Sequence, residues 1–359
     1  MCSNCGINID EAKSGAFAER MMTILNHGAL NLMISIGYRT GLFDAMNELE
    51  PSTSEEIAEA SGLDERYVRE WLGAMVTGEI LNYDLESKTY SLPPEHAAWL
   101  TRAAVPNNIA VTTQWISVLG AVEDKIVECF HNGGGVPYEA FERFHEVMSD
   151  ESNQTVIAPL LDQTLPLIPG LREKLEEGIE VMDLGCGSGF ALVHMAKEFS
   201  NSNFTGYDIS EEAIGRGTAH AAEHGITNVN LIAKDVAKIG DVKKFNLITT
   251  FDAVHDQADP DRVLKNINNA LKDDGVYLMQ DIAGSSHVHN NMDHLIGPFI
   301  YTISCMHCMT VSLSQDGKGL GAMWGKELAT EMLKNAGFTQ VEIKELPHDP
   351  INYYYIVKK

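Results

Sequence analysis

The second half of the chain alternates short apolar runs with stretches of helical periodicity. The runs IEVMDL, NFTGYD, VNLIA, FNLITTF and GVYLMQDI read as strands, and helical segments separate all of them except VNLIA and FNLITTF. This alternation predicts an α/β fold with a doubly wound, mostly parallel sheet and helices on both faces. After a helix at 326–336, the runs TQVEIKEL and INYYYIVKK predict a final hairpin that contributes an antiparallel strand and completes seven strands.

The first hundred residues predict helices and one hairpin. Residues 15–50 are unusually rich in apolar side chains for a pair of surface helices, which favours burial against a partner domain or subunit. In 52–92, two short helices begin at polar N-cap candidates and precede a hairpin that turns near Glu86–Ser87. Helix, helix and hairpin in this order predict a winged helix.

Charge decides between two uses of a winged helix. Residues 52–92 carry nine acidic side chains against Arg66, Arg69 and Lys88, a balance of 3 − 9 = −6. The whole chain of 359 residues has 51 acidic and 26 basic side chains, a net charge of −25. Because such a surface repels a phosphate backbone, we expect a structural or dimerising winged helix and no nucleic-acid partner.

Hydropathy and cysteine spacing exclude other classes. The chain has no run of 18 apolar residues, and its first residues have neither a basic start nor an apolar core, so we expect no membrane span and a cytoplasmic location. The chain has two C-x-x-C pairs, Cys2/Cys5 and Cys305/Cys308. Together they could form a Cys₄ zinc site, but the separation of 305 − 5 = 300 residues is far longer than the usual zinc spacing. We therefore expect free thiols and no metal site.

The segment VMDLGCGSG connects a strand to a helix through three glycines. Asp183 ends the strand, and Gly185, Gly187 and Gly189 permit a tight turn that a ligand can approach closely. Asp208 ends the next strand 208 − 185 = 23 residues later, near the ~20-residue offset at which an acid meets a ribose. The G-x-G-x-G spacing behind an acid favours a cationic sulfonium cofactor over a dinucleotide, because Asp183 would repel a pyrophosphate.

These motifs resemble those of the class I S-adenosylmethionine-dependent methyltransferases. DLGCGSG is similar to the family's first motif, GYDIS to its acidic second motif, and AKDVAKI to its third-strand acid. The resemblance implies a Rossmann-like sheet and S-adenosyl-L-methionine as the cofactor. It also assigns the ribose hydroxyls to Asp208, the adenine amino group to Asp235 and the methionine moiety to the backbone of 185–187. The cofactor-binding candidates are Asp183, Gly185, Cys186, Gly187, Gly189, Asp208, Ile209, Asp235, Val236 and Phe251.

The order of the segments is similar to that of small-molecule O-methyltransferases with an amino-terminal dimerisation domain. The stretches GGGVPY and HDQADP resemble an uncharacterised bacterial and invertebrate methyltransferase group. We therefore expect a winged-helix or dimerisation domain at 1–94, a helical linker contributing to the substrate pocket at 95–175 and a methyltransferase domain at 176–359. The resemblance also implies a homodimer and a small-molecule acceptor.

The loop TTFDAVHDQADP follows the fourth strand, whose carboxyl end lies on the ligand side of such a sheet. Asp259 and Pro260 are explained as the N-cap and first position of a helix. In the O-methyltransferases an HD pair in this loop carries the base that deprotonates the acceptor, and His255 is the matching residue. A histidine pKa near ~6.5 suits that task at neutral pH. The alternative is that His255 only bonds the cofactor or a neighbouring strand.

A long insertion at 284–324 follows the fifth strand and is expected to fold over the substrate. It reads either as a helical lid with buried sulfur atoms or as a site for a soft acceptor, which keeps S-methylation open beside O-methylation. The candidates for the substrate pocket are Tyr138, Tyr301, Cys305 and Cys308. Two rival functions are an S-adenosylmethionine-binding winged-helix regulator without methyl transfer, and an NAD-dependent dehydrogenase, which the glycine spacing opposes.

Overall fold

The computed structural model describes residues 9–359, so the Cys2/Cys5 pair lies outside the described residues. The chain forms two compact units, Met1–Ser117 and Val118–Lys359. The expected helical linker is divided between them, with 95–117 in the first unit and 118–175 in the second. The division into three segments at residues 94 and 175 stays a prediction.

The first unit has the predicted order of helix, helix and hairpin. Thr53 caps α3 in a reciprocal capping box with Glu56, and the Asp64 side chain accepts hydrogen bonds at the start of α4. Its elements are α1 (Glu11–Thr40), α2 (Leu42–Glu48), α3 (Ser54–Ser61), α4 (Glu65–Thr77), β1 (Asn82–Tyr83), β2 (Tyr90–Ser91), α5 (Pro94–Leu100) and the short turn η1 (Arg102–Ala104), with α6 (Gln114–Gly120) crossing the boundary.

The core of the first unit forms around Trp71 of α4. The Trp71 ring meets Phe43 edge to face at 5.2 Å, and its Nε1 donates to the Met33 carbonyl of α1 at 2.8 Å. A Cβ at Gly37 would lie 2.6 Å from the Trp71 ring, so only glycine allows α1 to cross α4 this closely. The amino-terminal part of α1 contributes little to this core, because the buried residues of the helix are Ser35 and Gly37.

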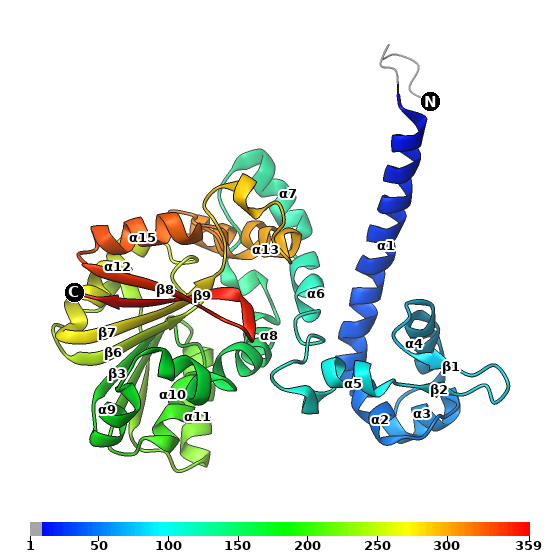
Figure 1. Ribbon diagram of the computed structural model, residues 1–359, viewed down its shortest axis with the longest axis horizontal. Coiled ribbons are helices and arrows are strands. Elements are labelled where there is room, and N and C mark those ends of the chain that lie inside the picture. Colours follow the sequence, from blue (N-terminus) through cyan, green and yellow to red (C-terminus); the bar gives the residue numbers. More distant parts are fainter. Residues whose placement is uncertain (1–8) are drawn as a thin grey trace. The chain divides into compact units, whose positions relative to one another are not determined.

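The second unit contains one large sheet and its helices (Figure 1). The strands are β3 (Glu180–Leu184), β4 (Asn203–Asp208), β5 (Val229–Ala233), β6 (Phe245–Phe251), β7 (Leu271–Ile282), β8 (Gln340–Leu346) and β9 (Asp349–Lys358). The α-helices are α7 (Glu123–Asn132), α8 (Phe144–Ser152), α9 (Leu171–Glu177), α10 (Phe190–Glu198), α11 (Glu211–Glu223), α12 (Pro260–Ala270), α13 (Gly297–Ile303), α14 (Met309–Leu313) and α15 (Gly325–Asn335). The short 3₁₀ and π turns are η2 (Tyr138–Ala140), η3 (Asn153–Ile157), η4 (Leu160–Thr164), η5 (Leu165–Leu167), η6 (Val236–Lys238), η7 (Val288–Asn291) and η8 (Ser304–Cys308).

The strand order is β5-β4-β3-β6-β7-β9-β8. The first five strands are parallel, and β9 runs antiparallel to both β7 and β8, which confirms the expected sheet and its terminal hairpin. Apolar side chains of α12 and α15 pack with one face of the sheet, and those of α9 and α10 pack with the other (Figure 1). The order reverses between β3 and β6, and such a switch point opens a ligand crevice at the carboxyl ends of the strands.

Within residues 9–359, no helix combines the length and apolar content needed to cross a lipid bilayer.

Candidate active site

The glycine turn after β3 is held by the neighbouring strand. The backbone N–H groups of Gly185 and Cys186 donate to the Tyr207 carbonyl at 2.8 and 3.2 Å. The three glycines have φ values of +70, +54 and +65°, a conformation that side chains disfavour. At Gly187 the position of a Cβ meets nothing within 4 Å in the described residues, so the turn leaves open space there.

Asp208 fastens this turn from the end of β4. Its Oδ2 accepts from Gly187 N at 2.8 Å, and its Oδ1 accepts from Ser210 N at 2.9 Å. Each oxygen retains a lone pair, because a carboxylate offers about four acceptor sites. Asp208 therefore both orders the glycine turn and stays able to accept hydrogen bonds from a ligand. Ile209, the next residue, is 62% exposed.

Asp183 is a buried carboxyl group under the turn. Thr249 Oγ1 donates to its Oδ1 at 2.7 Å. Burial raises the pKa of Asp183 to about 7, with Thr249 opposing this rise and the nearby charge of Asp208 adding to it. This carboxyl group therefore changes charge near neutral pH, and a cation placed beside it would favour the ionised form.

The other predicted cofactor residues lie at neighbouring strand ends. Asp235 is the N-cap of η6, where its Oδ1 accepts from Ala237 N at 2.9 Å and its Oδ2 pairs with Lys238 Nζ at 2.9 Å. Val236 is buried in the core beneath it, and Phe251 is the half-buried last residue of β6. Burial raises the pKa of the Cys186 thiol well above its usual range. The predicted contacts of these residues with adenine stay predictions.

The glycine turn and the His255 loop are in contact. A Cβ at Gly185 would lie 2.6 Å from the Cβ of Ala253, two residues before His255. The loop starts with Asp252 in the left-handed region at φ +50°, where its N–H donates to the Gln280 carbonyl of β7 at 3.0 Å. As predicted, Asp259 accepts from Arg262 N at 3.1 Å and Pro260 occupies the first turn of α12. The loop thus runs beside the glycine turn before entering the helix.

His255 is buried and pairs with Asp281 at the end of β7. Its Nδ1 lies 2.8 Å from Asp281 Oδ1, which also accepts from Trp324 Nε1 and Ile282 N, each at 2.9 Å. Asp281 Oδ2 has no hydrogen-bond partner among residues 9–359. The carboxylate therefore holds the imidazole in one orientation, and Nδ1 is the nitrogen that it engages.

Neighbouring groups and burial shift the pKa of His255 in opposite directions. Burial alone would lower its pKa, but the Asp281 carboxylate and the Cys308 thiol raise it, and the net result lies well above the usual value. Since Nδ1 is engaged by Asp281, Nε2 is the nitrogen left for Cys308 or a ligand. The ordinary histidine pKa expected from the sequence is therefore replaced by a raised one.

Aromatic rings surround the next part of the loop. Tyr138 Oη donates to Asp256 Oδ2, and burial together with this carboxylate raises the pKa of the phenol well above its usual range. The His307 ring stacks on Phe144 with centroids 4.2 Å apart and meets Tyr138 edge to face at 5.4 Å. Tyr138, which lies before α8, thus contacts both Asp256 of the His255 loop and His307 of the insertion after β7.

The insertion 284–324 is helical and supplies the remaining pocket candidates. Cys308 is buried at the end of η8 and Cys305 is half-buried, and both are free thiols. Tyr301 is 38% exposed and its Oη accepts from Asn291 Nδ2 at 3.0 Å. Cys308 is thus placed beside His255, whereas Tyr301 lies at the surface of α13.

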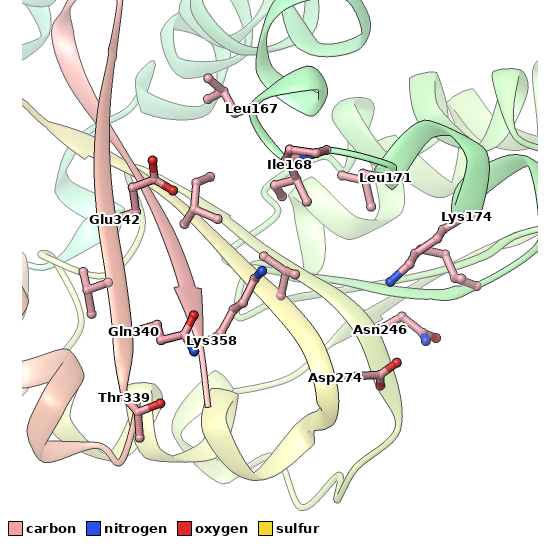
Figure 2. Close-up of a pocket in the computed structure, with 15 residues that line it drawn as sticks. Leu167, Ile168, Leu171, Lys174, Asn246, Asp274, Thr339, Gln340, Glu342 and Lys358 are labelled. Atoms are coloured by element: carbon pink, nitrogen blue, oxygen red, sulfur yellow. The ribbon is translucent and has the colours of Figure 1, made fainter.

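A separate cavity of about 580 Å³ opens at the other end of the strands (Figure 2). Its lining includes Asn246 at the start of β6, Asp274 in the first half of β7 and Lys358 at the end of β9. None of the predicted site residues lines this cavity, and ligands of doubly wound sheets bind at the opposite, carboxyl edge. We therefore assign the candidate active site to the switch point and not to this cavity.

Two protein-family descriptions match the chain. Residues 28–102 match the Rv2258c-like winged HTH domain, and residues 175–337 match a methyltransferase domain. Among curated proteins, N-methyltransferase 4 of Papaver somniferum is 30% identical over 109 residues, 30% of this chain and 31% of that protein. (S)-coclaurine N-methyltransferase of the same plant is 24% identical over 188 residues, 49% of this chain and 54% of that protein. The chain thus spans a third to a half of these relatives.

Solved structures share the whole architecture. Human N-acetylserotonin methyltransferase, in complex with S-adenosylmethionine, aligns with a TM-score of 0.70 over 99% of both chains at 14% identity. The mitomycin 7-O-methyltransferase MmcR aligns with a TM-score of 0.69 over 97% of this chain and 100% of its own, also at 14% identity. At this level of identity the likeness establishes the fold alone.

Proposed function

Because the chain belongs to the class I S-adenosylmethionine-dependent methyltransferases and carries an amino-terminal winged-helix domain, we propose that it methylates a small-molecule acceptor at oxygen or sulfur. S-adenosylmethionine is the cofactor of this domain and supplies, when bound, an electrophilic methyl group on a sulfonium sulfur. The observation that carries the proposal is the buried His255–Asp281 pair, on the loop that contacts the glycine turn.

The residues at the switch point fit this cofactor. The open position at Gly187 lets a ligand approach the backbone of the turn closely, and Asp208 can accept hydrogen bonds from ribose hydroxyls. Asp183 provides a carboxylate whose ionisation a cationic ligand would favour. Asp235 and Val236 lie at the next strand end, where the resemblance assigns adenine.

His255 is the proposed catalytic residue. Asp281 fixes the ring through Nδ1, so Nε2, on the ring that also contacts Cys308, is the atom that we assign to the acceptor's proton. Since the pKa of His255 is raised, the ring holds a proton at neutral pH and can bind an acceptor that arrives as an anion. At higher pH the neutral ring removes the proton itself, a contribution of about 10²–10⁴-fold for a positioned base.

This protonation state favours an acidic acceptor. A thiol, with a pKa of about 8.5, or a phenol whose substituents lower its pKa below about 10, supplies an anion that the imidazolium stabilises. The buried Cys308 beside His255 adds a soft, polarisable wall, and the Tyr138, Phe144 and His307 rings add aromatic surface. We therefore propose an aromatic alcohol or a thiol as the acceptor.

The direct test is product identification. The chain is incubated with methyl-labelled S-adenosylmethionine and a panel of phenols, thiols and arsenite, and the products are identified by mass spectrometry. Labelled product from at least one acceptor supports the proposal. Cofactor binding without any labelled product would favour the regulator.

The second candidate is an S-adenosylmethionine-binding regulator, which the winged-helix match favours. The balance of −6 over 52–92 weighs against a DNA surface. An electrophoretic shift on random duplex at low salt distinguishes the two, because a regulator that acts on DNA should bind under these conditions. We expect no shift with or without the cofactor.

We also propose that α1 mediates a homodimer. Its exposed apolar side chains recur along 20 residues of helix, and such faces on a surface helix mark a contact with another protein. They are Phe17, Met21, Met22, Ile24, Leu25, Leu32 and Ile36. A second copy of the chain provides an identical helix with the same apolar face.

A further inference from the structure

Three metal-ligating side chains meet at the carboxyl end of α11, outside the candidate active site. In the segment HAAEH, His220, Glu223 and His224 stand at positions i, i+3 and i+4, which share one face of a helix. One ligating atom from each lies within 4.8 Å of the other two. The two imidazole rings have centroids 4.3 Å apart. This cluster stands against the expectation from the cysteine spacing that the chain has no metal site.

The orientation of His224 suits metal ligation. Its Nδ1 lies 2.9 Å from the His220 carbonyl oxygen, which can only accept, so Nδ1 carries the proton of this hydrogen bond. The lone pair is then on Nε2, which is the arrangement found in most metal-bound histidines, where the second ring nitrogen donates to a carbonyl or carboxylate. The backbone thus fixes the tautomer that a metal needs before any ion binds.

The donor set selects the class of ion. Two imidazoles and one carboxylate match Zn²⁺ and its neighbours Ni²⁺ and Cu²⁺, whereas Mg²⁺ and Ca²⁺ prefer sites built from oxygen atoms. Glu223 and His224 are exposed and His220 is half-buried, so an ion has direct access from solvent. The net charge of −25 raises the local concentration of cations around the chain.

The position of the group suggests what an ion would do. His220 packs on Phe190, the first residue of α10, with ring centroids 4.7 Å apart. One turn earlier, a Cβ at Gly217 would lie 1.9 Å from the Ser188 carbonyl, so α11 rests directly on the glycine turn. Linking His220 to His224 would tie the last turn of α11 to its C-cap residue, His224.

We propose that His220, Glu223 and His224 bind one divalent transition-metal ion of the Zn²⁺ class and thereby fasten the end of α11 against the cofactor turn. Three protein ligands leave coordination positions for water. The site does not depend on the methyltransferase reaction, because none of its ligands belongs to the candidate active site.

Titration with Co²⁺ tests this proposal on the full-length chain without a polyhistidine tag. Co²⁺ replaces Zn²⁺ and gives visible d–d absorption when nitrogen and oxygen ligands hold it, while thiolate ligation adds a charge-transfer band in the near ultraviolet. We expect visible bands without the thiolate band. His224→Ala should abolish them and Glu223→Gln should weaken them, whereas His131→Ala, an exposed histidine of α7, should leave them unchanged.

Thermal unfolding with added ZnCl₂ provides the second measurement. A ligand that binds only the folded chain raises Tm, so Zn²⁺ should stabilise the wild type and the His131→Ala variant but not His224→Ala. His224 is exposed, so its replacement should leave the far-ultraviolet circular dichroism unchanged. The absence of visible Co²⁺ bands in the wild type, or bands that persist in His224→Ala, would overturn the proposal.

Discussion

Nδ1 of His255 lies 2.8 Å from Oδ1 of Asp281, which joins the loop after β6 to the end of β7. The Trp324 indole donates to the same oxygen, so the carboxylate is oriented from two sides. Both side chains are almost fully buried. This pair sets the charge of the imidazole and its direction, and the properties expected of His255 follow from it.

Replacing Asp281 should shift the titration of His255 towards lower pH. Asp281→Asn removes the charge that raises the pKa of the imidazole, so burial is then the main influence and lowers it. The ascending limb of methyl transfer against pH should move in the same direction. NMR titration of the His255 ring measures the pKa directly, and an unchanged pKa in Asp281→Asn would contradict the assigned pairing.

The same substitution should destabilise the fold in a pH-dependent way. A histidine with a raised folded-state pKa stabilises the fold fully below its unfolded pKa of about 6.5, and this contribution is lost as pH rises through the folded value. Breaking a buried pair costs about 3–5 kcal/mol. Urea unfolding of Asp281→Asn should therefore reveal the largest loss of stability below pH ~6.5 and a smaller loss at alkaline pH.

Cofactor affinity should increase as pH rises through about 7, the raised pKa of Asp183. The ionised carboxylate attracts the cationic cofactor, and the protonated carboxyl does not. Calorimetric titration with S-adenosylmethionine across pH 6–8 should reveal proton release on binding. Asp183→Asn keeps the Thr249 hydrogen bond and should flatten the pH dependence; a pH dependence that survives this substitution would assign the titration to another group.

Titration of Asp183 should change the stability of the cofactor-free protein in the direction opposite to its effect on cofactor affinity. Its folded-state pKa of about 7 lies above the unfolded value of about 3.9, so the folded chain binds the proton more tightly. Stability should therefore fall as pH rises between these two values. Urea unfolding of Asp183→Asn at several pH values should therefore lack this decrease in the free energy of unfolding.

A methyl group at Gly185 should damage the cofactor site. Its Cβ would lie 2.6 Å from Ala253, and the φ of +70° is strained for any side chain. We expect Gly185→Ala to weaken cofactor binding and to lower stability by at least about 1 kcal/mol. Gly215→Ala is the matched control, because within the described residues nothing lies within 4 Å of that Cβ. Because Gly215 is exposed within α11, Gly215→Ala should raise the free energy of unfolding by about 0.5–1 kcal/mol.

A charge in the apolar face of α1 should change the oligomeric state. Leu25 is 64% exposed at the middle of that face, so Leu25→Glu should produce monomers while leaving the far-ultraviolet circular dichroism unchanged. Glu19→Ala, a polar position of the same helix, should remain dimeric. Analytical ultracentrifugation measures both variants, and a monomeric wild type at micromolar concentration would contradict the proposed dimer.

The sequence predicted the sheet well, because most of its strands contain a short apolar run and most of the parallel strands are separated by helices of clear periodicity. The capping of α12 by Asp259 was also local and therefore readable. Asp281 was missed as the partner of His255, because the two residues are 26 positions apart and only the pairing of β6 with β7 brings them together. An acid at the end of the apolar run YLMQDI was the available signal.

The raised pKa of His255 could not be read from the sequence either. It depends on the balance between burial and two neighbours, Asp281 and Cys308, which come from different segments. Tyr138 as a lining residue of the substrate pocket stays a prediction, and its hydrogen bond to Asp256 could not be read from the sequence because the two residues are 118 positions apart. Local pattern predicted which elements form, and tertiary contacts determined the chemistry of their side chains.

Methyl transfer by His255→Ala tests the central claim most directly, provided that cofactor binding is measured separately on the same preparation. Turnover is followed with labelled S-adenosylmethionine and the acceptor identified from the panel. We predict cofactor affinity close to that of the wild type and turnover reduced by about 10²–10⁴-fold. Unchanged turnover with that acceptor would contradict a catalytic role for His255.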